Sequence, residues 1–135
     1  MIYTDFCWSV YEEGKNMADI YVGNGWSSSI VGEIKDDGSI YKGSGWSKEY
    51  IGFVNENGEV YKGSGWSKEY IGMVSGDGYV YKGHGWSKDN VGQIKYKRDI
   101  YKGSGWSSEY MGYIKDECYA LHGGAAFLLL IEPVL

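Results

Sequence analysis

A repeat of twenty residues that carries one tryptophan each time constrains this chain more than any other feature. The repeated tryptophans are equally spaced: Trp26, Trp46, Trp66, Trp86 and Trp106. Each follows a glycine and precedes a serine, as in residues 40–52, which read IYKGSGWSKEYIG. Self-similarity at a fixed period is typical of solenoids, propellers and other repeat arrays. The repeat therefore predicts how the chain is built, and it names no reaction.

The repeat divides the chain into one domain, residues 1–135, with imperfect units at both ends. Residues 2–19 form a degenerate N-terminal unit, and residues 20–119 form five full repeats. Residues 120–135 form an apolar C-terminal cap in which Ala126 takes the place of the tryptophan. Atypical end units are expected, because an outermost repeat lacks one of its two neighbours.

Each full unit contains two short β-prone segments that are joined by a glycine turn. Residues 36–38 (DDG), 56–58 (ENG) and 76–78 (GDG) are hairpin signals. A three-residue loop with a left-handed glycine pairs β-branched residues with each other throughout: Ile34 with Ile40, Val54 with Val60, Val74 with Val80, and Ile94 with Ile100. A two-residue loop would pair Val54 with Tyr61, so we prefer the first register, which gives one apolar face.

The fourth turn departs from this pattern. Residues 95–99 read KYKRD and contain no glycine. A non-glycine residue in the left-handed region costs about 1–2 kcal/mol. We therefore expect this hairpin to be strained or to use a different turn.

Lysines at one position of the repeat bear on how the units are arranged: Lys42, Lys62, Lys82 and Lys102. One strand per repeat would place them about 5 Å apart, whereas two strands per repeat would double the distance to about 10 Å, close to a Debye length. The wider spacing favours hairpins. We therefore predict an all-β fold in which tandem hairpins form a solenoid, a spiral or a stacked array. A closed propeller is disfavoured because its blades usually contain about forty residues, and we find no helical periodicity.

Composition and motifs exclude several function classes. Aromatic residues make up 17% of the chain, which argues against disorder, and the net charge of -5 disfavours a nucleic-acid partner. No Cys/His spacing suits zinc, and no glycine-rich phosphate loop is present. The residues that depart from the repeat, such as His84, Asn90 and Gln93, form no acid–base pair. We therefore predict a protein that is not an enzyme and that has no cofactor or metal.

The termini and cysteines give further expectations. The N-terminus lacks the regions of a signal peptide, so we expect a cytoplasmic protein by default. The longest apolar run, residues 125–131, is too short to cross a membrane, which takes about twenty helical residues. Cys7 and Cys118 make no disulfide framework, and free thiols are favoured.

The repeated tryptophans admit two interpretations. Residues 43–50 and their equivalents are too rich in glycine for a helix, so we expect a turn that aims the tryptophan inward or towards the next unit. The favoured interpretation makes these side chains the core between repeats. The alternative is a surface on which they bind a sugar or a quaternary ammonium group beside a tyrosine. Its candidate ligand-binding residues are Trp26, Trp46, Trp66, Trp86, Trp106, Tyr41, Tyr61, Tyr81 and Tyr101.

The apolar segment at residues 127–131 also has two interpretations. The favoured one is a last strand that closes the apolar face of the array. The alternative is an exposed edge for self-association, which unprotected apolar edges promote.

The Gly-Trp pairs at this period, followed by a hairpin turn, are similar to choline-binding cell-wall repeats. The similarity covers Gly25-Trp26, Gly45-Trp46, Gly65-Trp66, Gly85-Trp86 and Gly105-Trp106. It implies a superhelix of hairpins that holds choline between Trp and Tyr side chains of adjacent units. The chain also resembles small uncharacterised bacterial proteins with Gly-Trp repeats and a Gly-Gly-Ala-Ala plus leucine tail, here residues 123–130. That resemblance implies no activity.

Together these observations predict a non-enzymatic structural or interaction module. The alternative is a module that binds a carbohydrate or choline-type ligand through repeated Trp and Tyr surfaces. Its expected partners are another copy of the chain, bound through the C-terminal apolar segment or sheet edges, or a glycan or choline-like ligand. No nucleic acid and no membrane span are expected.

Overall fold

The strands of this protein close into one antiparallel barrel. The computed structural model describes residues 17–23, 25–43, 45–83, 85–103, 105–115 and 120–134. The strands follow one another around the ring in the order β1-β10-β9-β8-β7-β6-β5-β4-β3-β2. Their bounds are Met17–Val22 (β1), Ser29–Lys35 (β2), Ser39–Lys42 (β3), Glu49–Val54 (β4), Glu59–Lys62 (β5), Glu69–Val74 (β6), Tyr79–Lys82 (β7), Asp89–Lys95 (β8), Asp99–Lys102 (β9) and Glu109–Ile114 (β10).

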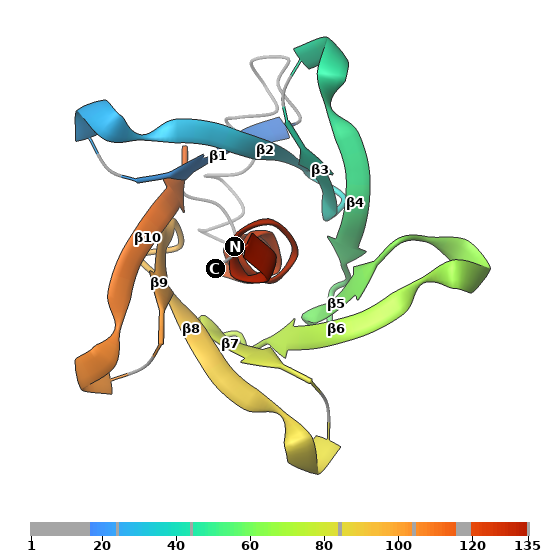
Figure 1. Ribbon diagram of the computed structural model, residues 1–135. Helices are drawn as coiled ribbons and strands as arrows, with labels where there is room; N and C mark the ends of the chain where they lie inside the picture. Colours follow the sequence, from blue (N-terminus) through green and yellow to red (C-terminus); the bar gives the residue numbers. More distant parts are fainter. Residues whose placement is uncertain are drawn as a thin grey trace, which may run out of the picture.

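Five hairpin arms radiate from this barrel (Figure 1). In each arm two consecutive strands are joined at the outer end by a short 3-10 turn. The turns are Gly25–Ser27 (η1), Gly45–Ser47 (η2), Gly65–Ser67 (η3), Gly85–Ser87 (η4) and Gly105–Ser107 (η5). Each arm therefore carries one repeat tryptophan at its tip, and each junction between arms lies near the barrel axis.

The predicted register at the junctions is confirmed. The structure pairs Ile34 with Ile40, Val54 with Val60, Val74 with Val80, and Ile94 with Ile100. In the second junction the amide of Gly58 donates to the carbonyl of Asn55 at 3.0 Å, and Gly58 adopts a φ of 87°. The carbonyl of Gly58 then accepts a 2.8 Å bond from Val74, in the next arm. The turn glycine thus closes its own loop and ties neighbouring arms together.

The fourth junction differs, as expected from its lack of glycine. Tyr96 and Lys97 have φ values of 57° and 62°, so two successive non-glycine residues occupy the left-handed region. The amide of Arg98 donates to the carbonyl of Lys95 at 3.1 Å, and Lys95 still pairs with Asp99. The fourth junction therefore has the same register as the others, but the backbone of its turn is strained.

Closure of the ring contradicts the predicted solenoid, spiral or open array, although the all-β prediction is confirmed. β1 pairs with β10, and Ile20 lies opposite Ile114 as Val54 lies opposite Val60. The spacing of the lysines describes neighbouring units only. It is the same in an open array and in a ring, so it carried no information about closure.

A bulge with a buried glycine recurs along every arm. In the second arm Ile40 lies opposite Gly52 and Tyr41 opposite Tyr50, which leaves Ile51 as the extra residue. A Cβ atom on Gly52 would lie 2.1 Å from the backbone oxygen of Tyr61. The equivalent position is glycine in the other four arms: Gly32, Gly72, Gly92 and Gly112. Bulges increase the local twist and bend a strand, which lets each arm turn away from the barrel wall.

The C-terminal segment fills the barrel as a helix. Helix α2 (Ala120–Ala126) continues into a π-helix, η6 (Phe127–Ile131), and a 3-10 turn, η7 (Glu132–Val134). Figure 1 shows this helix at the centre of the ring. Each strand presents one buried β-branched residue to it: Ile20, Ile34, Ile40, Val54, Val60, Val74, Val80, Ile94, Ile100 and Ile114.

The predictions of a last strand and of an exposed edge are therefore both wrong, although the segment does cover the apolar face of the strands. The segment is no strand, and it is not exposed, since Phe127 is 0% and Leu128 1% accessible. A helix that is apolar on all sides is stable only when it is surrounded, and a closed ring of Ile and Val side chains surrounds it. Gly124 allows the close approach, because a Cβ atom there would lie 2.4 Å from a methyl group of Val74.

Candidate functional site

Five tryptophans at the tips of the arms are the most unusual surface feature of the described chain. We call Trp26, Trp46, Trp66, Trp86 and Trp106 the arm-tip tryptophans; their relative accessibilities are 105–107%. Tryptophan is a largely buried residue type in most folded proteins. The expectation that these side chains form the core between repeats, pointing inward or across to the next unit, is therefore wrong.

The tip of each arm is a short 3-10 turn, and its hydrogen bonds do not involve the indole. In the third arm the amide and Oγ of Ser67 donate to the carbonyl of Ser64 at 3.3 and 3.1 Å. The amide of Lys68 donates to the carbonyl of Gly65 at 3.4 Å. Gly65 has a φ of 59° and nothing within 4 Å of the place where a Cβ atom would lie. The backbone of the turn thus presents the indole to solvent rather than against the arm.

Pairs of tyrosines pack across the second, third and fifth arms, behind the tips. Tyr61 and Tyr70 pair across the third arm with ring centroids 5.5 Å apart at 78°. In the second arm the hydroxyl of Tyr50 donates to the carbonyl of Gly63 at 3.3 Å, across to the next arm. Burial raises the pKa of Tyr50 and of Tyr70 above the usual value. These contacts pack the side chains of the second and third arms behind their tips.

The candidate tyrosines Tyr41, Tyr61, Tyr81 and Tyr101 already have cations over their rings. The Nζ atoms of the covering lysines lie 4.5–5.4 Å from the ring centroids: Lys48 over Tyr41 at 5.4 Å, Lys68 over Tyr61 at 4.7 Å, Lys88 over Tyr81 at 4.9 Å and Lys95 over Tyr101 at 4.5 Å. The arm-tip tryptophans are too exposed to contact these tyrosines. The structure therefore does not bring the predicted Trp and Tyr residues together into an aromatic cage for choline.

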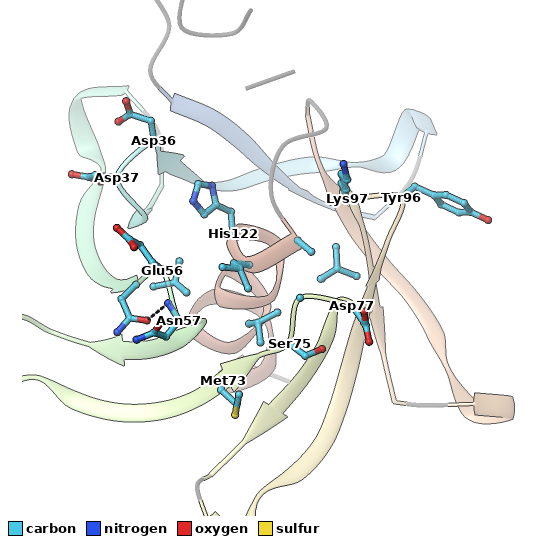
Figure 2. Close-up of a pocket in the computed structure, with 17 residues that line it drawn as sticks. Asp36, Asp37, Glu56, Asn57, Met73, Ser75, Asp77, Tyr96, Lys97 and His122 are labelled. Carbon is cyan, nitrogen blue, oxygen red and sulfur yellow. Dashed lines mark hydrogen bonds between the residues drawn. The ribbon is translucent and has the colours of Figure 1, made fainter. Parts of the chain in front are cut away.

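A second feature, which the sequence analysis did not find, is a cavity of about 1140 Å³ at the mouth of the barrel. Figure 2 shows carboxylates of Asp36, Asp37 and Glu56 around it, with His122 of α2 facing them. Its floor is apolar and includes Val74. In the sequence these acidic residues are ordinary turn residues. The barrel brings the two turns side by side, and the helix adds His122 to them.

Local hydrogen bonds explain the positions of Asp37 and Asn55 at this mouth. Oδ1 of Asp37 accepts a 2.9 Å bond from the amide of Ser39, and this backbone bond lowers the pKa of Asp37. Oδ1 of Asn55 accepts 3.0 Å bonds from the amides of Asn57 and Glu59. Burial lowers the pKa of His122 to about 4, against the opposing influence of Asp36 and Asp37. His122 is therefore neutral near pH 7.

Among the described residues, no group of three His, Cys, Asp or Glu side chains is placed to hold a metal ion. No helix in the described part of the chain is long and apolar enough to cross a membrane. Three residues considered in the sequence analysis, Cys7, His84 and Cys118, lie outside the described residues.

Comparison of the chain with family models, with curated proteins and with solved structures finds no match. The resemblances to choline-binding repeats and to small Gly-Trp repeat proteins therefore stay predictions.

Proposed function

We propose that this protein is a non-enzymatic interaction module that binds its partner through the arm-tip tryptophans. The observation that carries the proposal is their accessibility of 105–107% in all five arms. A tryptophan offers about 150–250 Å² of largely apolar surface for burial. Contact between this apolar surface and water is unfavourable at each of the five tips. A partner that covers the tips removes that surface from water, which favours binding.

The way in which the tryptophans are presented supports the same proposal. Each tip is a short hydrogen-bonded turn on a packed arm, and all five arms share one barrel. Preorganised contacts bind with a smaller loss of conformational entropy than flexible ones. Repeated weak sites on one scaffold also raise the overall affinity by about 10²–10⁴ when the partner reaches several of them.

The test compares the wild-type chain with a five-tip variant in which every arm-tip tryptophan is replaced by alanine. Both proteins are offered hydroxyethylcellulose, zwitterionic phosphatidylcholine vesicles and anionic phosphatidylserine vesicles, and self-association is measured by sedimentation. We expect at least one of these interactions to be much weaker in the five-tip variant than in the wild type. The matched control is Tyr96→Asn, which removes another exposed aromatic side chain, 74% accessible, at the barrel mouth.

Two results would overturn the proposal. The first is that no interaction in this set depends on the tips. The second is a reproducible catalytic turnover, in a panel of hydrolase and transferase assays, that a single substitution abolishes.

A further inference from the structure

We propose that the ligand of the arm tips is a neutral polysaccharide, whose sugar rings stack on the indoles and whose strands the five arms cross-link. This inference depends on the proposed function and names the ligand class of the same site. Three properties of the tips support it: the open faces of the indoles, the charge around them and the directions in which they point.

Both faces of each indole are open to solvent, because accessibilities of 105–107% leave no part of the side chain covered. A sugar ring has an apolar C–H face and polar edges, so it complements the flat face and the polar N–H edge of an indole. Serine follows each tryptophan, and in the third arm Oγ of Ser67, whose hydrogen is donated to Ser64, keeps lone pairs that can accept from a sugar hydroxyl. Each tip therefore offers a platform for one sugar ring.

The charge around the tips favours an uncharged polymer. In the third arm the residues after Trp66-Ser67 are Lys68 and Glu69, whose charges cancel. The second and fourth arms repeat this balance, the first arm has serines at both positions, and the fifth has Ser108 and Glu109. Since the whole chain carries a net charge of -5, a polyanion or an anionic membrane is repelled. A neutral chain of sugars meets no such barrier.

The cationic alternative is weakened by the chain's own lysines. Nζ of Lys68 lies 4.7 Å from the centroid of Tyr61 and 5.6 Å from that of Phe53. A quaternary ammonium ligand held in a cage that includes this tyrosine would have to displace the internal cation, since both seek the same negative ring faces. An uncharged sugar has no need of the tyrosines and uses only the free indoles.

The directions of the arms favour a branched or meshed ligand. Figure 1 shows the five tips pointing away from the barrel axis in five different directions. A compact partner that approaches the ring from one side, across the barrel axis, then meets only some of them. Several polymer strands passing the molecule on different sides meet all of them, so the molecule joins those strands.

The experiment uses two soluble polymers with the same cellulose backbone and different charge. The full-length chain is run in affinity electrophoresis through gels containing hydroxyethylcellulose, which is neutral, or carboxymethylcellulose, which is anionic. We expect retardation in the neutral gel, weaker retardation in the anionic gel at low salt, and none for the five-tip variant. Dextran and galactomannan gels then establish which backbone the indoles prefer.

Cross-linking is tested separately by light scattering. A single-tip variant that keeps only Trp66 has one site, so it should bind with an affinity about 10²–10⁴ lower and should not raise the scattering of the polymer. Circular dichroism of each variant establishes that it is folded, which the exposure of the tips leads us to expect.

The outcomes separate this inference from the proposed function. Tryptophan-dependent binding to vesicles or self-association, with no tryptophan-dependent retardation by any neutral polysaccharide, overturns the ligand class and leaves the interaction function standing. Independence from the tips in every assay overturns both. Equal scattering by the single-tip variant and the wild type overturns the cross-linking role.

Discussion

The interior of the barrel and the tips of the arms are built from the same twenty-residue unit, yet they bury their apolar residues to opposite extents. The paired Ile and Val positions are 0–4% accessible, whereas the arm-tip tryptophans are 105–107% accessible. This difference in burial follows from the distance between each residue and the barrel axis. Near the axis, ten strands and a helix converge, and every apolar side chain finds neighbours. At the tips, the arms diverge, and no described residue covers the indoles.

This comparison teaches that repetition of an apolar residue does not by itself indicate a core. Removing a packed side chain from the interior should destabilise the fold. Removing the larger indole from a tip should not.

The largest effect should come from Phe127, which has no accessible surface at the centre of the ring. Replacing Phe127 with alanine leaves a cavity that the surrounding strands cannot collapse to fill. We expect a loss of about 3–5 kcal/mol in the free energy of unfolding, measured by urea denaturation. A loss below about 1 kcal/mol, the size expected for a surface change, would contradict the central role of the helix.

The next largest effect tests the bulge where an arm leaves the barrel. Gly52→Ala places a Cβ atom 2.1 Å from a backbone oxygen, so the strands must separate. We expect a loss of about 3 kcal/mol, at the upper end of the range for overpacking. The matched control is Gly76→Ala, because nothing lies within 4 Å of that position. If the two variants melt at the same temperature, the bulge glycine has no steric role.

A smaller effect should depend on pH through His122. Burial lowers the pKa of its imidazole from 6.5 to about 4, so the unfolded state binds a proton more readily between these values. The stabilisation is complete above about pH 6.5 and is lost as the pH falls towards 4, by on the order of 2 kcal/mol. Denaturation of the wild type and of His122→Gln at pH 7 and pH 4.5 measures it. If the free energy of unfolding falls equally in both proteins between pH 7 and pH 4.5, groups other than His122 cause the pH dependence.

The hairpin unit and its register can be predicted from the sequence, because both are determined by residues that are close together in the chain. Pairing Ile34 with Ile40 and placing a left-handed glycine at position 38 depend on neighbouring residues only. Closure, the helical tail and the exposed tips depend on how five units meet. Phe127 and its neighbours are apolar on all sides, so their pattern carried no period from which helix or strand could be chosen.

The same reasoning explains why the burial of the tryptophans was predicted wrongly. A tryptophan in a glycine-rich loop is compatible with burial or with exposure, since the loop has no period. The candidate tyrosines are close to the tryptophans in the sequence. In the folded chain, however, they pack against other side chains, as Tyr61 packs against Tyr70.

Relief of the strained turn should give a modest gain. Lys97 has a φ of 62°, which costs a non-glycine residue about 1–2 kcal/mol. Lys97→Gly should therefore stabilise the protein by up to about 1 kcal/mol, after the larger chain entropy of glycine is subtracted. Glu56→Gly, in a turn without this strain, should not stabilise. Calorimetric measurement of the melting temperature of both variants tests the expectation. An equal shift of the melting temperature in both would contradict the role of backbone strain at Lys97.

The smallest effect should come from the tips. Trp66→Ala removes the largest side chain type from a position that is 107% accessible, so we expect a change within about 0.5 kcal/mol. Urea denaturation under the conditions used for Phe127→Ala gives the direct comparison. A loss above about 2 kcal/mol would mean that the indole packs in solution, and the contrast between the two regions would disappear.

Closure of the ring also limits how this gene product can vary in length. In an open array, one unit more or fewer changes only the extent of the structure. Here the diameter of the ring grows with the number of strands, while the helix inside has one fixed width. Loss of one twenty-residue unit would bring Val74 and Ile94 onto a helix already as close as Gly123 and Gly124 allow. Repeat number and the residues of the central helix must therefore change together.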